Sequence, residues 1–122
     1  MNISCWTYIL ENGFEVLAGK TDVDNDTLSL TIAKPNDYWF HASGSPGSHV
    51  ILRHLKTTSP AREILEQAAS IAAWHSKSRN NKIAKVTYTL AKNISKPRGS
   101  SPGSVNVKRT KILKVRPGLP AY

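Results

Sequence analysis

A single cysteine, Cys5, is all the thiol chemistry that the sequence offers. One thiol excludes an internal disulfide framework and a multi-thiolate zinc site, and it is typical of the reducing cytoplasm, where we expect this protein. The sequence also has no apolar run long enough to span a membrane and no charged-then-apolar signal peptide at its start. We therefore expect no membrane association.

Acidic residues are missing from the second half of the chain. All eight Asp and Glu precede residue 67, whereas residues 67–122 contain twelve Lys or Arg. The net charge of +9 therefore divides into 5 − 8 = −3 for residues 1–66 and +12 for the rest. Such asymmetry predicts a polyanionic partner, because each neutralised phosphate also releases a condensed counterion. RNA, DNA and anionic lipid all meet this condition, and lipid ranks last because no helix pattern pairs a strong apolar face with a basic one.

The stretch from Asp37 to Arg53 is the most informative part of the sequence. Two apolar runs, 38–40 and 50–52, predict strands, and they flank a loop, 43–48, that contains two Gly, one Pro and three Ser. Free N–H groups in such a loop can form a nest for an anion. A histidine stands at each end, His41 and His49. The loop is therefore a candidate site for a phosphate or another polar group.

Other interpretations of the same stretch stay open. A Gly/Pro hairpin turn with ordinary histidines at its edges explains the pattern without any function. His41, His49 and Asp37 also suit a general acid–base pair or a metal site, although two histidines and a carboxylate often occur at such spacing by chance. Alternation along a strand places Asp37, Trp39 and His41 on one face. We assign no catalytic residue, and we predict neither a metal nor a cofactor.

The central stretch resembles the RNA-binding domain of NFACT proteins (NFACT-R). The resemblance extends over residues 68–80, 86–88 and 96–105, and it covers the chain from about Gly19 to Val105. Large NFACT proteins tag stalled nascent chains in ribosome quality control and act with tRNA and the large ribosomal subunit. Because they combine this domain with others, the resemblance implies for this chain only the RNA-binding module.

We therefore expect an RNA-binding protein whose partner is tRNA or ribosomal RNA, with association with the ribosome. Two alternatives remain, a small RNA-processing or RNA-modifying enzyme that uses His41, His49 and Asp37, and an adaptor that binds any polyanion. The oligomeric state stays open. The residues that we predict to contact RNA come from the central stretch and from later cations: Asp37, Trp39, His41, Ser43, Gly44, Pro46, Gly47, Ser48, His49, Arg53, Lys77, Arg79, Lys96 and Arg98.

Two segments before the central stretch have a predicted structure. Residues 5–10 and 14–18 flank Asn12-Gly13, a strong hairpin signal, and predict two antiparallel strands. For about 23–33 the family resemblance implies a short helix with Asp22 as N-cap. Alternation of Leu28, Leu30 and Ile32 favours a strand instead. We prefer the helix, and both interpretations stay open.

After the central stretch, Ser59 and Pro60 predict the start of one long helix over about 60–79. Its apolar stripe is typical of a helix packed on a sheet. Residues 86–90 alternate as a strand, 95–104 form a second Gly/Pro/Ser loop, and 105–107 with 112–115 predict a closing hairpin. We expect one α+β domain over 1–116, a mostly antiparallel sheet with a helix on one face, and an unstructured tail over 117–122.

Overall fold

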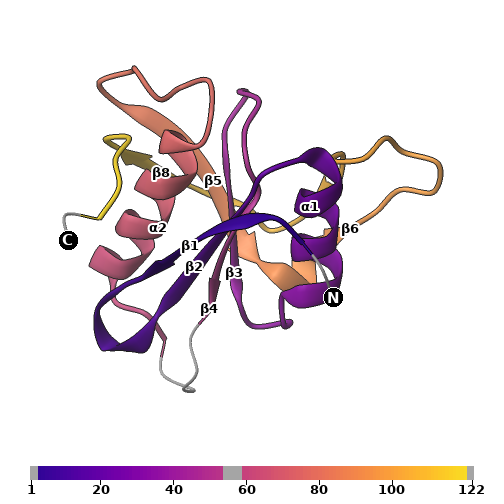
Figure 1. The fold of residues 1–122 in the computed structure, drawn as a ribbon, viewed down its shortest axis with the longest axis horizontal. Coiled ribbons are helices and arrows are strands. Elements are labelled where there is room, and N and C mark those ends of the chain that lie inside the picture. Colours follow the sequence, from indigo (N-terminus) through magenta and orange to yellow (C-terminus); the bar gives the residue numbers. More distant parts are fainter. Residues whose placement is uncertain (1–2, 54–58, 121–122) are drawn as a thin grey trace.

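The described residues, 3–53 and 59–120 of a computed structural model, form an antiparallel sheet with helical segments on both faces (Figure 1). The six strands lie in the order β1-β2-β4-β3-β5-β8, and a separate two-stranded sheet pairs β6 with β7. The α+β class is therefore confirmed. The strand bounds are β1 Cys5–Ile9, β2 Glu15–Gly19, β3 Tyr38–Ala42, β4 Val50–Arg53, β5 Ala84–Leu90, β6 Ile94–Ser95, β7 Asn106–Val107 and β8 Lys111–Val115.

The first two of the three predicted hairpins are present. In the first, β1 pairs with β2 from Cys5 opposite Gly19 to Ile9 opposite Glu15, through a 3-10 turn at Glu11–Gly13. Gly13 has φ +80°, a backbone conformation that glycine adopts without a steric cost. In the second hairpin, β3 pairs with β4, and β3 also pairs with β5. The predicted loop therefore leaves from the middle of the sheet.

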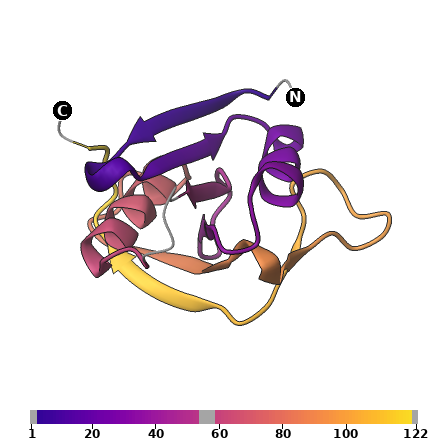
Figure 2. The ribbon, with the colours of Figure 1, turned by 90° about the horizontal axis from the view of Figure 1, so that it is seen from below.

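Alternation along β3 divides the core into two layers. Tyr38 and Phe40 face helix α2 (Arg62–Trp74), whereas Trp39 faces the opposite layer, which helix α1 (Asp22–Thr27) covers. Figure 2 shows the two helices on opposite sides of the sheet. Small side chains let α2 lie close to the strands, since Ala68, Ala69, Ala72 and Ala73 are all fully buried. The sheet is therefore the middle layer of the molecule.

The segment predicted as a short helix is helical, so the strand interpretation was wrong. Helix α1 covers Asp22–Thr27 and continues into a wider π-helical turn at Leu28–Ile32. Its N-cap is Thr21, one residue before the predicted Asp22, and the Thr21 hydroxyl accepts a hydrogen bond from the Asp24 N–H at 3.1 Å. Leu28 is fully buried, which shows that the helical turn contributes to the second layer.

The predicted long helix over 60–79 was wrong in length, because α2 has only 13 residues, Arg62–Trp74. At its start Ala61 is the N-cap and is extended, so Ser59 and Pro60 lie before the helix. At its end the Ser48 N–H donates to the His75 carbonyl at 2.9 Å, and the Ser76 hydroxyl donates to the Ala73 carbonyl. These donors satisfy carbonyls that another helical turn would use.

The predicted closing hairpin was also wrong. Strand β7, Asn106–Val107, pairs with β6, and β8 pairs with β5 instead. The apolar side chains of Val105 and Val107 pack against the layer around Trp39 and Leu28, so this segment covers the second layer instead of extending the sheet. Hydrophobic contact across the chain therefore overrides the local hairpin pattern.

The C-terminal residues 117–120, predicted as part of an unstructured tail, have no helix or strand. The Gly118 N–H donates to the Ser70 carbonyl of α2 at 3.2 Å. Among the residues that the structure describes, neither helix has the length and apolar character that a membrane crossing requires.

Candidate nucleic-acid interface

The predicted loop 43–48 is docked onto the residues that follow α2. Gly47 and Ser76 form an isolated antiparallel bridge, with the Ser48 N–H donating to His75 and the Lys77 N–H donating to the Pro46 carbonyl, both at 2.9 Å. A Cβ on Gly47 would lie 2.6 Å from the Ser76 Cβ and 2.8 Å from the His75 carbonyl oxygen. Glycine is therefore required here for close approach. The left-handed residue of the loop is Gly44, with φ +64°.

His49 is part of a buried polar network behind the loop. The imidazole Nδ1 lies 2.9 Å from the Ser29 hydroxyl, which also accepts a hydrogen bond from the Trp39 indole at 3.0 Å. The His49 N–H donates to the Asn25 side-chain oxygen at 3.0 Å. His41 packs against both rings, with centroid distances of 5.9 Å to Trp39 and 5.5 Å to His49. These contacts stabilise the fold and leave His49 buried.

Burial changes the acid–base properties of both histidines. Desolvation, with a smaller contribution from His41, lowers the pKa of His49 from 6.5 to about 4. Desolvation also lowers the pKa of His41. A general base is most effective when its pKa lies near the working pH, so the His49 imidazole is not tuned for that role at neutral pH.

Asp37 lies at the opposite end of β3 from the loop. Its carboxylate accepts a hydrogen bond from the Lys34 N–H at 2.9 Å and lies 3.7 Å from the Arg53 Nε. Asp37 and His41 are four positions apart along the extended chain, which corresponds to about 13 Å at the usual rise. The structure therefore does not bring together the trio that the enzyme alternative requires. In the described part of the chain, no group of three His, Cys, Asp or Glu could hold a metal ion.

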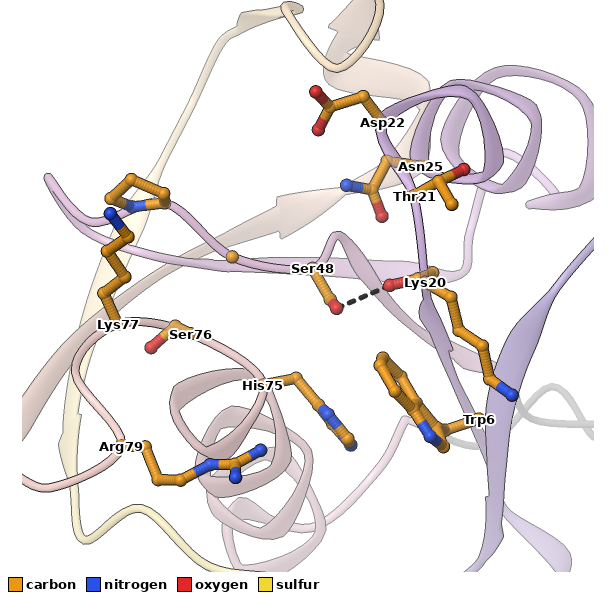
Figure 3. Close-up of a pocket in the computed structure, with 13 residues that line it drawn as sticks. Trp6, Lys20, Thr21, Asp22, Asn25, Ser48, His75, Ser76, Lys77 and Arg79 are labelled. Carbon is orange, nitrogen blue, oxygen red and sulfur yellow. Dashed lines mark hydrogen bonds between the residues drawn. The ribbon is translucent and has the colours of Figure 1, made fainter.

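A cleft of about 410 Å³ lies beside the docked loop (Figure 3). Its walls come from four segments: β1, the junction of β2 with α1, the end of the loop, and the turn after α2. Among the described residues that line it, one is acidic, Asp22, and three are cationic, Lys20, Lys77 and Arg79. The residues that line it are Trp6, Gly19, Lys20, Thr21, Asp22, Asn25, Pro46, Gly47, Ser48, His75, Ser76, Lys77 and Arg79.

An aromatic pair forms one side of the cleft. The Trp6 and His75 rings are stacked, with centroids 4.1 Å apart and an interplanar angle of 15°. The Tyr8 hydroxyl lies 2.6 Å from the His75 Nε2 and holds this ring in place. Desolvation, and then the charge of Arg79, lower the pKa of His75 from 6.5 to about 4, so the ring is neutral at pH 7. Trp6 is 38% exposed and remains accessible from the cleft.

Three cations surround the aromatic pair. Lys20 lies between β2 and α1, and its ammonium is 5.2 Å from the centre of the Trp6 ring. The Arg79 guanidinium lies 4.4 Å from the Trp74 ring, and its Nε donates to the Trp74 carbonyl at 2.7 Å. Lys77 is exposed. The cleft thus combines an accessible aromatic surface with positive charge, the two features with which proteins hold unpaired nucleotides.

Residues 5–109 match the family model described as the NFACT protein RNA binding domain. The chain belongs to this family. The resemblance of the central stretch is thereby confirmed.

Relatives and a solved structure agree with this assignment. The Rqc2 homolog RqcH of Streptococcus suis is 38% identical over 102 residues, which are 84% of this chain and 18% of the relative. The Rqc2 homolog RqcH of Bacillus subtilis is 33% identical over 91% of this chain and 19% of its own length. The C-terminal structure of the fibronectin/fibrinogen-binding protein from Streptococcus suis has a TM-score of 0.88 at 34% identity and covers 97% of this chain and 47% of that chain. This NFACT-R domain therefore spans less than a fifth of either curated relative.

The cleft of this NFACT-R domain contains five of the residues predicted to contact RNA, Pro46, Gly47, Ser48, Lys77 and Arg79. The others lie apart from it. Trp39 and His49 are buried, and Ser43 bonds Thr87 across the sheet. Their contacts with RNA stay predictions, as do those of Asp37, His41, Gly44, Arg53, Lys96 and Arg98.

Eight lining residues were not predicted, and they include the aromatic pair Trp6 and His75 and the cation Lys20. A signal for the first was present in the alternation of β1, which places Trp6 and Tyr8 on one face of an edge strand. Nothing in the local sequence indicates that this face meets the end of α2. The cleft is therefore a product of the tertiary fold.

Lys96, a predicted RNA contact, organises the second Gly/Pro/Ser loop of the NFACT-R domain. Its ammonium lies 3.0 Å from the Asp26 carboxylate and donates to the carbonyls of Ser101 and Ser104. The Gly103 N–H donates to the same Asp26 carboxylate at 3.0 Å. The side chain thus fastens the loop to the end of α1.

We expect Lys96→Ala to lower the free energy of unfolding by about 1 kcal/mol, because it removes a partly buried ion pair and two hydrogen bonds to carbonyls. Arg98→Ala in the same loop is the matched control and should change stability by less than about 0.5 kcal/mol, since Arg98 is exposed. Urea denaturation of both variants checks this. Equal midpoints for Lys96→Ala and the parent protein would show that the loop does not depend on the ion pair.

Proposed function

We propose that this chain binds RNA and that the cleft beside loop 43–48 is its main contact surface. The observation that carries the proposal is the accessible Trp6–His75 stack with Lys20, Lys77 and Arg79 around it. Membership of the NFACT-R family and the strongly basic second half support the same function. No step of this function needs a metal, a cofactor or a catalytic residue.

The shape of the cleft favours unpaired nucleotides over a duplex. A base that stacks on Trp6 must leave its own helical stack, and proteins read RNA mostly at such loops, bulges and ends. The cations then lie where the flanking phosphates would pass. Loop 43–48 contributes its shape, because its docking on Ser76 forms the wall opposite α1.

We further propose that the RNA is tRNA or ribosome-associated RNA and that the protein works in the cytoplasm. The relatives named Rqc2 homolog RqcH and the place of NFACT proteins in ribosome quality control support this setting. The activity of a whole relative does not follow, because this domain covers less than a fifth of one.

We expect Trp6→Ala to weaken binding of a short single-stranded RNA by roughly 5- to 150-fold, the range of about 1–3 kcal/mol per stacked base. Lys77→Ala should reduce the dependence of log Kd on log salt by about one unit. Arg62→Ala is the charge-matched control, since Arg62 is 75% exposed and lies on the first turn of α2, far from the cleft. Fluorescence anisotropy over a salt series measures both effects.

The same titrations separate the alternatives. If six phosphates are neutralised, the slope of log Kd against log salt for the parent protein should be about +4 for a single strand. Equal affinity for duplex DNA would favour an adaptor that binds any polyanion, and cleavage or modification of tRNA by the purified protein would favour an enzyme. Trp6→Ala and Lys77→Ala variants that fold and bind like Arg62→Ala would contradict the proposed cleft.

A further inference from the structure

A second concave surface lies at the other end of the molecule. It encloses about 530 Å³, and it is lined by Tyr38 at the start of β3, by Tyr88 on β5 and by Leu65 on α2. The cleft lies beyond the opposite end of β3. Along the axis of α2, Leu65 and His75 are ten positions apart, which corresponds to about 15 Å. The two sites are therefore separate. We call this second surface the basic pocket.

The basic pocket is strongly positive. Lys92, Arg109 and Lys111 line it, all three are exposed, and no acidic residue is among its described lining. Within the described ranges, none of the three cations forms an ion pair. Tyr38 and Tyr88, with ring centroids 6.3 Å apart, are half-buried and add hydroxyl groups. Uncompensated charge in a hollow focuses the field and attracts anions.

Arg109 has an unusual backbone. Its φ is +53°, the only left-handed value of a non-glycine residue among the described residues. Glycine adopts such a conformation without a steric cost, whereas a side chain at this position is strained. The turn itself therefore favours glycine. A role of the Arg109 side chain in binding would explain why an arginine occupies this position.

A buried polar network holds that strained turn. Thr89, which is 5% exposed, donates from its hydroxyl toward the carbonyls of Lys108 at 2.9 Å and Arg109 at 3.1 Å. The Asn93 amide donates to the Thr89 hydroxyl at 2.9 Å, and the Lys108 N–H donates to the Asn93 carbonyl at 3.1 Å. These hydrogen bonds thus fix the backbone around Arg109. The Arg109 guanidinium makes no hydrogen bond to another described residue.

We propose that the basic pocket is a second binding site for RNA phosphates, formed by Arg109, Lys92 and Lys111 with the two tyrosine hydroxyls as donors. The chemistry fits because a guanidinium donates two parallel hydrogen bonds to a phosphate, and ammonium and hydroxyl groups complete its shell. This site rests on the proposed RNA-binding function. It adds that a bound RNA contacts both ends of α2 and not the cleft alone.

The test uses Arg109→Gly, which removes the guanidinium and also relieves the backbone strain. We expect a melting temperature equal to or above that of the parent protein, with binding of a single-stranded RNA long enough to span both sites weakened roughly tenfold. The slope of log Kd against log salt should fall by about one. Lys111→Gln should show the same loss without a change in backbone preference.

The outcomes are distinguishable. Arg109→Gly and Lys111→Gln that bind like the parent protein, while Trp6→Ala weakens binding, would overturn the second site and leave the cleft in place. A parent protein that binds no RNA would overturn the proposed function and this inference with it. Weakened binding by Arg109→Gly with an unchanged or raised melting temperature supports the basic pocket, because a purely structural role predicts no loss of affinity.

Discussion

Trp39→Ala is expected to lower the free energy of unfolding by about 3–5 kcal/mol, the usual cost of removing a buried large aromatic side chain. Trp39 is 3% exposed and packs with Leu17, Leu28 and Ile51 in the layer under α1. Its indole also donates to Ser29, and that hydroxyl contacts His49. The substitution therefore leaves both a cavity and a broken polar network. Urea denaturation monitored by circular dichroism measures the loss.

Trp6→Ala is the matched control for this prediction, because Trp6 is the exposed tryptophan of the cleft. It should lose much less stability than Trp39→Ala but more affinity for RNA. The two tryptophans thus separate folding from binding. A loss of less than about 1 kcal/mol in Trp39→Ala would show that the layer under α1 contributes little to stability.

Gly47→Ala is expected to lower the free energy of unfolding by about 1–3 kcal/mol, the typical cost of inserting a methyl group into a packed contact. The new Cβ would lie 2.6 Å from the Ser76 Cβ and 2.8 Å from the His75 carbonyl oxygen, so loop 43–48 must move away from the end of α2. The hydrogen bonds from Ser48 and Lys77 that dock the loop would weaken with it. RNA binding should fall as well, since this contact forms a wall of the cleft.

Substitutions at two other glycines distinguish steric overlap from backbone strain as the cause of the lost stability. A Cβ on Gly118 would meet no heavy atom within 4 Å, and Gly118 has no positive φ, so Gly118→Ala should be nearly neutral. Gly44 has equal space but a φ of +64°, so Gly44→Ala should show the cost of strain alone, about 1 kcal/mol. If Gly47→Ala matched Gly118→Ala, close packing against α2 would be refuted.

Local patterns in the sequence predicted the α+β class, the first two hairpins and the loop at 43–48, because strands and turns are encoded by residues close together in the chain. Alternation along β3 fixes the faces of Tyr38 and Trp39 once a strand is assumed. The Gly/Ser/Pro composition of 43–48 marks a loop for the same local reason. The resemblance added the family and the helix at about 23–33.

The length of α2 and the fate of 105–107 depended on distant residues and could not be predicted in the same way. Lys77 and Arg79 follow residues with helical periodicity, yet the helix ends before them, where the Ser48 N–H of loop 43–48 donates to the His75 carbonyl. Val105 and Val107 alternate like residues of a strand in the main sheet, but they pack against the apolar surface around Trp39 instead. Local pattern and tertiary contact compete in such segments, and here the tertiary contact prevails.

The site shows the same limit. His41 and His49 were predicted from their place beside a Gly-rich loop, and that place is equally suited to supporting the loop from behind. Whether the His49 imidazole faces solvent or a buried serine is decided by the position of Ser29 in the π-helical turn, twenty residues away. Trp6 and His75 are separated by 68 intervening residues, so their stacking has no local signature.

Because four segments of the chain form the cleft, binding of RNA there can be detected from the stability of the protein, without any assay of activity. The unfolded chain has no cleft, because its walls meet only after β1, α1, the loop and the end of α2 are in place. By mass action, a ligand that binds the native state alone adds RT ln(1 + [L]/Kd) to its stability, about 2.7 kcal/mol at a ligand concentration of 100 Kd. A panel of RNAs can therefore be ranked by the upward displacement of the melting curve.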